Sequence, residues 1–186
     1  MLTQFPTMTN STFALSTIVM VPTIALVVFR YLRERPANIP PVGFSEEARA
    51  TIDRAAHESR LRGDRPTTPE HLLFAMLADR LSSAALVLEQ SGVDVVALRT
   101  RLLDGLPAPS RPPASEPPMP AYTNAARLVL ERSTREAFDA HQSEVLSVHL
   151  LAGVLQDRRS TASRMLRARG VSLQAVRDGG RALSPR

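Results

Sequence analysis

The sequence predicts an all-α protein made of two tandem four-helix repeats, preceded by one transmembrane helix. The segment that begins at Phe44 matches the segment that begins at Tyr122 in one register and without a gap. Strands are disfavoured because aromatic residues make up only 4% of the chain, and neither copy alternates apolar and polar residues over more than a few positions. A tandem repeat indicates a duplicated packing unit, and such units form binding scaffolds more often than active sites.

The amino terminus predicts a membrane anchor. The run from Phe13 to Phe29 contains no charged residue, and a helix of about 20 residues rising about 1.5 Å each spans the roughly 30 Å of a bilayer core. No charge precedes this run and arginines follow it directly, so the positive-inside rule places the carboxyl side in the cytoplasm. A signal peptide, which would carry its positive charge before the run, and a misread start codon are the alternatives.

Proline-rich stretches separate the predicted parts of the chain, and the stretch between the two copies contains seven prolines. We expect a chain end without regular structure to be disordered, and we include Gly179 and Gly180 in that end. The predicted parts are a short polar tail (1–11), the transmembrane helix (12–33), a spacer (34–43), copy 1 (44–104), a linker (105–121), copy 2 (122–178) and a disordered tail (179–186).

Helix-start and helix-stop residues divide copy 1 into four short helices. Ser45 caps the first helix, and two acids follow it in the first turn, where the helix dipole favours them. Thr68 caps the second helix, with proline at the first helical position. Ser82 caps the third helix, which Gly92 ends in a left-handed conformation, and Asp94 caps the fourth.

Copy 2 repeats this order of helix-start and helix-stop residues. Thr123, Ser147, Ser160 and Ser172 are its four predicted caps, and Gly170 is the stop after its third helix. Acids and arginines alternate at helical spacing along its first helix, which predicts ion pairs on the surface of that helix. The residues concerned are Arg127, Glu131, Arg132, Arg135 and Glu136.

Composition excludes several classes of enzyme. The chain has no cysteine, which excludes disulfides, a thiol nucleophile and cysteine-ligated zinc. All 23 of its basic residues are arginine, so a P-loop lysine and a Schiff-base lysine are excluded as well. Hydrolase and glycine-rich phosphate-binding motifs are absent from the sequence. We therefore predict no enzyme activity, no cofactor and no metal site.

Two of the four histidines occupy equivalent positions in the copies. His71 and His149 each begin a leucine-rich helix. They could form a metal site across the two copies, or each could bond to the first turn of its own helix. The second interpretation is favoured, because no acid or cysteine recurs beside them. His57 and His141 do not correspond to each other, and we expect them at the surface.

Six segments carry a resemblance to a known family. They are Phe44–Ala48, Thr68–Leu77 and Val87–Asp94 in copy 1, and Tyr122–Thr123, Ser147–Leu155 and Leu166–Val171 in copy 2. Together they resemble the Clp amino-terminal repeat, the substrate- and adaptor-binding domain of the ClpA, ClpB and ClpC unfoldases. The resemblance implies a pseudo-two-fold fold of two four-helix units that binds proteins or peptides. Those unfoldases continue into ATPase modules, whereas this sequence ends at Arg186 and contains no lysine, so we expect a free-standing domain.

The expected contact surface is the groove between the copies, near the starts of their second helices. Some ClpC-type domains bind phosphoarginine with the acid that precedes the motif histidine. Glu70 matches that acid in copy 1, whereas Val148 replaces it in copy 2. The alternative is that Glu70 only stabilises the first turn of its own helix. The candidate binding residues are Thr68, Glu70, His71, Ser147 and His149.

The sequence thus predicts a membrane-anchored, non-enzymatic module that binds proteins or peptides on the cytoplasmic side of a bacterial membrane. Its expected partners are clients, adaptors or subunits of a Clp protease or unfoldase. It is expected either to recruit clients or adaptors to that protease or unfoldase, or to compete for the ligands of that protease or unfoldase. Nucleic acid and small-molecule substrates are not expected. The net charge of +5 leaves an alternative, in which arginines bind anionic lipid or nucleic acid. A hydrolase would need a paired titratable cluster, which the sequence does not offer.

Overall fold

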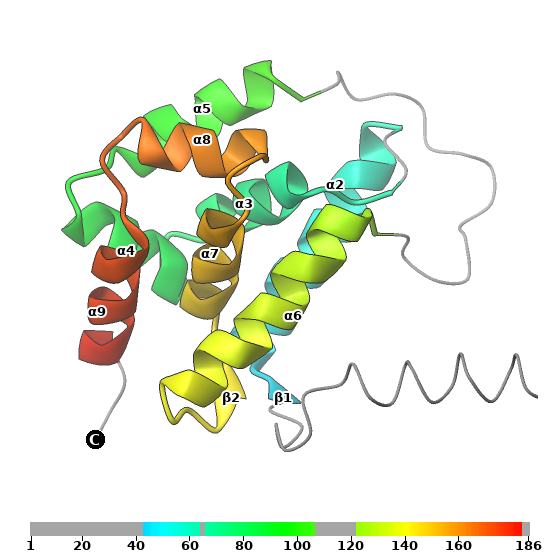
Figure 1. Ribbon diagram of the computed structural model, residues 1–186. Coiled ribbons are helices and arrows are strands. Elements are labelled where there is room, and N and C mark those ends of the chain that lie inside the picture. Colours follow the sequence, from blue (N-terminus) through cyan, green and yellow to red (C-terminus); the bar gives the residue numbers. More distant parts are fainter. Residues whose placement is uncertain (1–42, 64–65, 107–121, 184–186) are drawn as a thin grey trace, which may run out of the picture. The chain divides into compact units, whose positions relative to one another are not determined.

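A computed structural model describes residues 43–63, 66–106 and 122–183, which form an all-helical arrangement apart from two very short strands (Figure 1). The predicted transmembrane helix (12–33) lies outside the described residues, as does nearly all of the linker (105–121). Within the described residues, no single helix is long and apolar enough to cross a membrane. The second and third helices of copy 1 pass such a test only as a pair, bent by 82°.

The helix bounds confirm the duplication. Copy 1 contains β1 (Gly43–Phe44), α2 (Glu46–Leu61), α3 (Pro69–Ala78), α4 (Ser83–Gln90) and α5 (Val95–Asp104). Copy 2 contains α6 (Asn124–Asp139), β2 (Glu144–Val145), α7 (Ser147–Gln156), α8 (Thr161–Arg167) and α9 (Leu173–Leu183). The shift that carries Phe44 onto Tyr122 also carries both ends of α2 onto α6 and both ends of α3 onto α7.

Local capping explains why these helices begin where they do. A side-chain oxygen at each of six predicted caps accepts a hydrogen bond from the backbone N–H three residues later. These caps are Ser45, Ser82, Asp94, Thr123, Ser160 and Ser172. Gly92 and Gly170 take the predicted left-handed conformation, with φ of +77° and +79°. The sequence therefore specifies most helix ends locally.

Two predictions at the helix ends are wrong. Ser147 is the first residue of α7 and Leu146 precedes the helix as its N-cap, so Ser147 corresponds to Pro69, the first residue of α3. The predicted tail from residue 179 is also wrong in its first part, because α9 continues through Gly179 and Gly180 to Leu183. Both glycines lie against other helices, which keeps this last turn ordered by packing rather than by propensity.

The strands join the copies reciprocally. β1 and β2 are parallel and pair Phe44 with Val145, and an isolated parallel bridge pairs Thr67 with Tyr122. Under the repeat shift Phe44 corresponds to Tyr122 and Thr67 to Val145, so the two pairings are equivalent. In each case, the segment that leads into the first helix of one copy pairs with the segment before the second helix of the other. Neither strand was predicted, since two residues show no periodicity.

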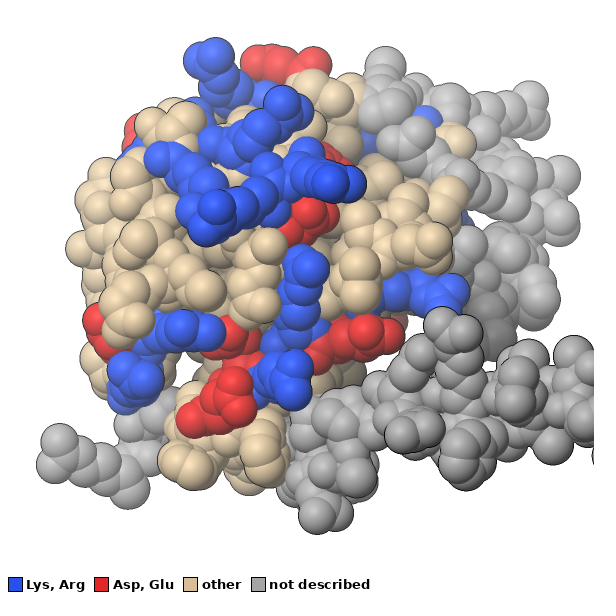
Figure 2. All heavy atoms as spheres, in the orientation of Figure 1, with Lys and Arg blue, Asp and Glu red and all other residues tan. Residues whose placement is uncertain are grey.

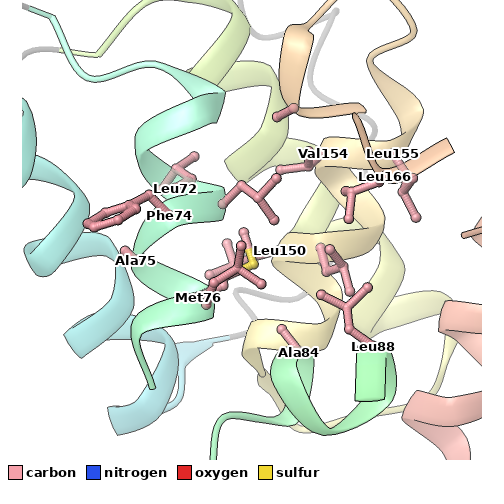
Figure 3. Close-up of a cluster of buried hydrophobic side chains, with 14 of the residues drawn as sticks. Leu72, Phe74, Ala75, Met76, Ala84, Leu88, Leu150, Val154, Leu155 and Leu166 are labelled. Atoms are coloured by element: carbon pink, nitrogen blue, oxygen red, sulfur yellow. The ribbon is translucent and has the colours of Figure 1, made fainter. Parts of the chain in front are cut away.

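One hydrophobic core serves both copies. Figure 3 shows Leu72 and Met76 of α3, with Leu88 of α4, facing Leu150 and Val154 of α7. All five side chains are fully buried, and burying each one contributes about 1.5–3 kcal/mol. Because α3 and α7 share this core, the copies form one compact unit rather than two separate domains.

Candidate binding site

The two equivalent histidines lie at the starts of α3 and α7 and bond to their own helix turns. The Nδ1 atom of His71 accepts from the N–H of Thr68 at 3.3 Å, and that of His149 accepts from the N–H of Leu146 at 3.0 Å. His71 is fully buried and His149 is 8% exposed. Burial lowers the pKa of His149, against the opposing effect of nearby carboxylates. The helix-start interpretation is confirmed.

A metal site between the histidines finds no support in the described part of the chain. Across residues 43–63, 66–106 and 122–183, no group of three or more His, Asp or Glu side chains is arranged to hold a metal ion. Thr68 faces His71, with 3.0 Å between its hydroxyl oxygen and Nδ1. The first turn of α3 therefore uses these two polar groups internally.

Glu70 connects the copies. It lies in the first turn of α3, as predicted, and its Oε1 accepts from the backbone N–H groups of Thr161 at 2.9 Å and Ala162 at 3.2 Å. These are the first two residues of α8, whose helix dipole favours a carboxylate at this end. Glu70 thus caps a helix of the other copy, and one of its oxygens is already engaged there.

Ser147 belongs to a polar cluster at the start of α4. Its hydroxyl bonds to Oε1 of Glu47 and accepts from the N–H of Ala84 at 2.9 Å. The Ser83 hydroxyl donates to the same Glu47 oxygen at 3.1 Å and accepts from the N–H of Val148 at 3.1 Å. The cluster therefore satisfies the starts of both α4 and α7. Glu47 and Ser83 could not be recognised as site residues from the sequence, because only the fold brings them to Ser147.

A pocket of about 230 Å³ lies elsewhere, among α6, α7 and α9 of copy 2. His149 is the only one of the five candidate residues that lines it. Val148, Ala152 and Val176 form an apolar part of its lining, and Glu136 and Arg177 form a charged part. Gly180 of α9 also lines it. The candidate residues thus belong to interhelical contacts, whereas the concave site of copy 2 depends on residues that the sequence had not singled out.

An ion pair at this pocket corrects the prediction for α6. Glu136 is 5% exposed and pairs with Arg177 of α9 through two hydrogen bonds, of 2.8 and 2.7 Å, not with an arginine of its own helix. Gln156 of α7 donates a third bond to the same carboxylate at 2.5 Å. The hydrogen bond to Glu136 raises the pKa of Arg177. A bidentate pair of this kind fixes both side chains.

Comparison with known families identifies this architecture. The model of the Clp repeat (R) N-terminal domain matches residues 43–169 and 121–183. The chain belongs to the Clp N-terminal repeat family. The matched ranges cover both copies, which agrees with the predicted resemblance.

Relatives in sequence include a mycobacterial protein and a chloroplastic Clp chaperone. A Mycobacterium tuberculosis protein is 33% identical over 115 residues, which cover 61% of this chain and 43% of that protein. The chloroplastic chaperone protein ClpC1 of Oryza sativa is 29% identical over 134 residues, covering 72% of this chain and 14% of ClpC1. This Clp repeat chain therefore spans less than half the length of the relatives it matches.

Solved structures share the Clp N-domain fold. The N-domain of ClpV from Vibrio cholerae has a TM-score of 0.61 at 19% identity, covering 73% of this chain and 81% of that domain. A complex of a ClpV N-domain with a VipB peptide has a TM-score of 0.58 at 18% identity, covering 72% of this chain and 82% of that one. At these identities the likeness establishes the fold.

Proposed function

We propose that this protein is a membrane-anchored, non-enzymatic binding module that recruits clients or adaptors to a Clp protease or unfoldase, or competes for their ligands. The observation that carries the proposal is the Clp repeat fold, which in the ClpV N-domain accommodates a VipB peptide. The anchor rests on the uncharged run from Phe13 to Phe29 and the arginines after it, which orient the domain toward the cytoplasm.

A crosslinked pull-down from native membranes tests this proposal. The full-length chain is compared with a variant that lacks residues 1–35, and bound proteins are identified by mass spectrometry. We expect Clp subunits, adaptors or their clients to be enriched with the full-length chain at the membrane. If neither form retains a specific protein partner, the proposed function is wrong. If the shortened form fractionates with membranes equally well, the anchor is wrong and the binding role is judged separately.

A second candidate function rests on a concentration of arginines around α8. Figure 2 shows basic side chains gathered on the upper part of the face where Figure 1 places α8. Arg158, Arg159, Arg164 and Arg167 are exposed, and no carboxylate among the described residues forms an ion pair with them. Their counterparts in copy 1 are Arg80, Leu81, Leu86 and Glu89. Copy 2 thus presents a positive surface that copy 1 lacks, which favours an anionic partner.

Salt dependence separates the two functions. Binding to anionic lipid or nucleic acid through these arginines should weaken steeply between low and moderate salt. The triple variant R158Q/R159Q/R164Q should lose that salt-sensitive material and retain protein partners bound elsewhere. If the variant and the parent chain retain the same material at every salt concentration, the arginine surface is not the binding site.

A further inference from the structure

The place that is a pocket in copy 2 is filled in copy 1. Phe74 of α3 is only 3% exposed, and the guanidinium groups of Arg99 and Arg62 lie 5.0 and 5.7 Å from the centre of its ring. These distances are within the range of cation–π attraction. Copy 1 therefore encloses an aromatic side chain of its own between α2, α3 and α5.

The repeat shift carries this arrangement onto the lining of the pocket. Ala152 replaces Phe74, and Ala140 replaces Arg62, so the ring and one of its covering arginines are missing from copy 2. Gly180 also replaces a buried leucine of α5. Arg177, the counterpart of Arg99, remains at the site. The pocket of copy 2 thus occupies the position that the aromatic ring fills in copy 1, and one of the two arginines that cover the ring, Arg177, is retained there.

The remaining side chains suit an aromatic ring. Val148, Ala152 and Val176 contribute apolar surface, and all three are buried. Glu136 holds the guanidinium of Arg177 through two hydrogen bonds. A ring that contacts this arginine therefore binds without the entropy cost of ordering its side chain. The volume of about 230 Å³ is below the roughly 300–1,000 Å³ typical of small-molecule sites. A single side chain matches it better than a cofactor.

We propose that this pocket of copy 2, defined by Ala152, Val148, Val176 and Arg177, binds an aromatic side chain of a partner protein in the position that Phe74 occupies in copy 1. The inference rests on the proposed function, since it assumes that the partner is a protein. It adds the chemistry of the anchor residue, because aromatic side chains that enter pockets supply much of the energy of protein interfaces. The rim residues Asp139 and Arg181 then contact the polar backbone that flanks the ring.

A methyl NMR titration tests the pocket directly. The full-length chain in detergent micelles, with labelled alanine and valine methyls, is titrated with N-acetyl-L-phenylalaninamide. We expect saturable shifts at the methyls of Val148, Ala152 and Val176, and none at these positions with N-acetyl-L-alaninamide. Equal shifts with both probes, or saturable shifts elsewhere only, would overturn the proposal.

Two variants and a control make the test specific. Ala152→Phe supplies the missing ring and should abolish the saturable shifts. Ala140→Arg restores, at the half-buried residue that follows α6, the second arginine that lies over the ring in copy 1, and it should make the shifts saturate at a lower probe concentration. If Ala152→Phe fails to fold, Ala140→Arg still decides the outcome. Ala175→Phe adds the same ring at an exposed position of α9 and should leave the shifts unchanged. Shifts that persist in a folded Ala152→Phe, or that saturate no earlier in Ala140→Arg than in the parent chain, contradict the proposal.

The proposal and the proposed function can fail separately. Protein partners captured equally by the parent chain and the Ala152→Phe variant would leave the binding role standing and remove the pocket from it. Probe shifts at the pocket without any protein partner in the pull-down would show a ring-binding site and overturn the proposed recruiting function. Loss of both signals in Ala152→Phe, with the Ala175→Phe control unaffected, is the expected result.

Discussion

The two copies have matching helices and different interiors at one equivalent place. In copy 1, Phe74 lies beneath Arg99. The acid Glu58 of copy 1 pairs with Arg62, one turn later at the end of α2. In copy 2, Ala152 leaves a pocket and the equivalent acid, Glu136, pairs with Arg177 of α9. The same backbone therefore supports an aromatic plug in one copy and an open site beside an ion pair in the other.

This difference teaches that caps and turns preserve the backbone while side chains diverge inside it. Helix ends depend on bonds within three or four residues, which any later change in the core leaves intact. The space between helices depends on the total volume of several side chains, which can be redistributed. A duplicated fold can thus keep one copy closed and open the other.

Exchanging the plug should give the largest effect. Phe74→Ala removes a buried ring and should lower the free energy of unfolding by about 3 kcal/mol. Ala152→Phe places the ring where copy 2 has space and should cost about 1 kcal/mol or less. Urea denaturation of both variants measures the difference. A loss in Ala152→Phe as large as that in Phe74→Ala would show that the two places are not equivalent.

The ion pair should come next. Arg177→Ala leaves Glu136 buried without its bidentate partner and should destabilise the fold by about 2 kcal/mol, less than for a fully buried pair because the arginine is 38% exposed. Arg99→Ala, the matched change in copy 1, removes a cation–π contact and should cost about 0.5–1 kcal/mol. Thermal unfolding of both variants would contradict the comparison if Arg99→Ala were the more harmful.

The spacing of the central helices differs as well. A Cβ at Gly153 of α7 would lie 2.6 Å from the carbonyl oxygen of Val129, closer than real contacts allow, whereas copy 1 accommodates Ala75 at the equivalent position. Gly153→Ala should therefore destabilise by about 1–2 kcal/mol despite the better helix propensity of alanine. Ala75→Gly should cost about 1 kcal/mol. A stabilised Gly153→Ala variant would show that α6 and α7 can separate freely.

A substitution at the end of α6 should increase the stability of the fold. Gly63 and His141 are equivalent and both have positive φ, at +71° and +56°. Histidine is strained in this conformation, so His141→Gly should stabilise the fold by about 0.5–1 kcal/mol. Gly63→His should do the reverse by about 1 kcal/mol. Denaturant midpoints of the two variants should move in opposite directions, and a shared direction would refute this explanation.

The smallest expected effect is a pH dependence from copy 2. Burial lowers the pKa of His149 below the 6.5 of an exposed histidine, so the unfolded state binds more protons. Stability should therefore fall as the pH decreases through 6.5, and this loss should end below the native pKa. His149→Asn keeps an acceptor for the N–H of Leu146 without titrating. Its stability should change less than that of the parent chain between about pH 5 and 7; parallel curves would contradict the assignment.

Much of the candidate site could not be predicted from the sequence. The repeat register paired His71 with His149 correctly, and it pointed to Glu70 as a first-turn acid. The role of Glu70 as a cap of α8 depends on a residue 91 positions away, and the pocket depends on Gly180, which the sequence placed in a disordered tail. Neither feature has a local pattern, because each arises where helices from distant segments meet.

The sequence by itself determined the duplication, the eight described helices and most of their ends, since a cap or a left-handed glycine acts through bonds to residues three or four positions away. It also supports an anchor at residues 12–33, which stays a prediction. Only the tertiary structure decided that Glu136 pairs with Arg177, that Ser147 joins two helix starts, and that copy 2 holds a pocket. Those outcomes depend on which side chains fill the space between packed helices, and this space does not exist until the helices assemble.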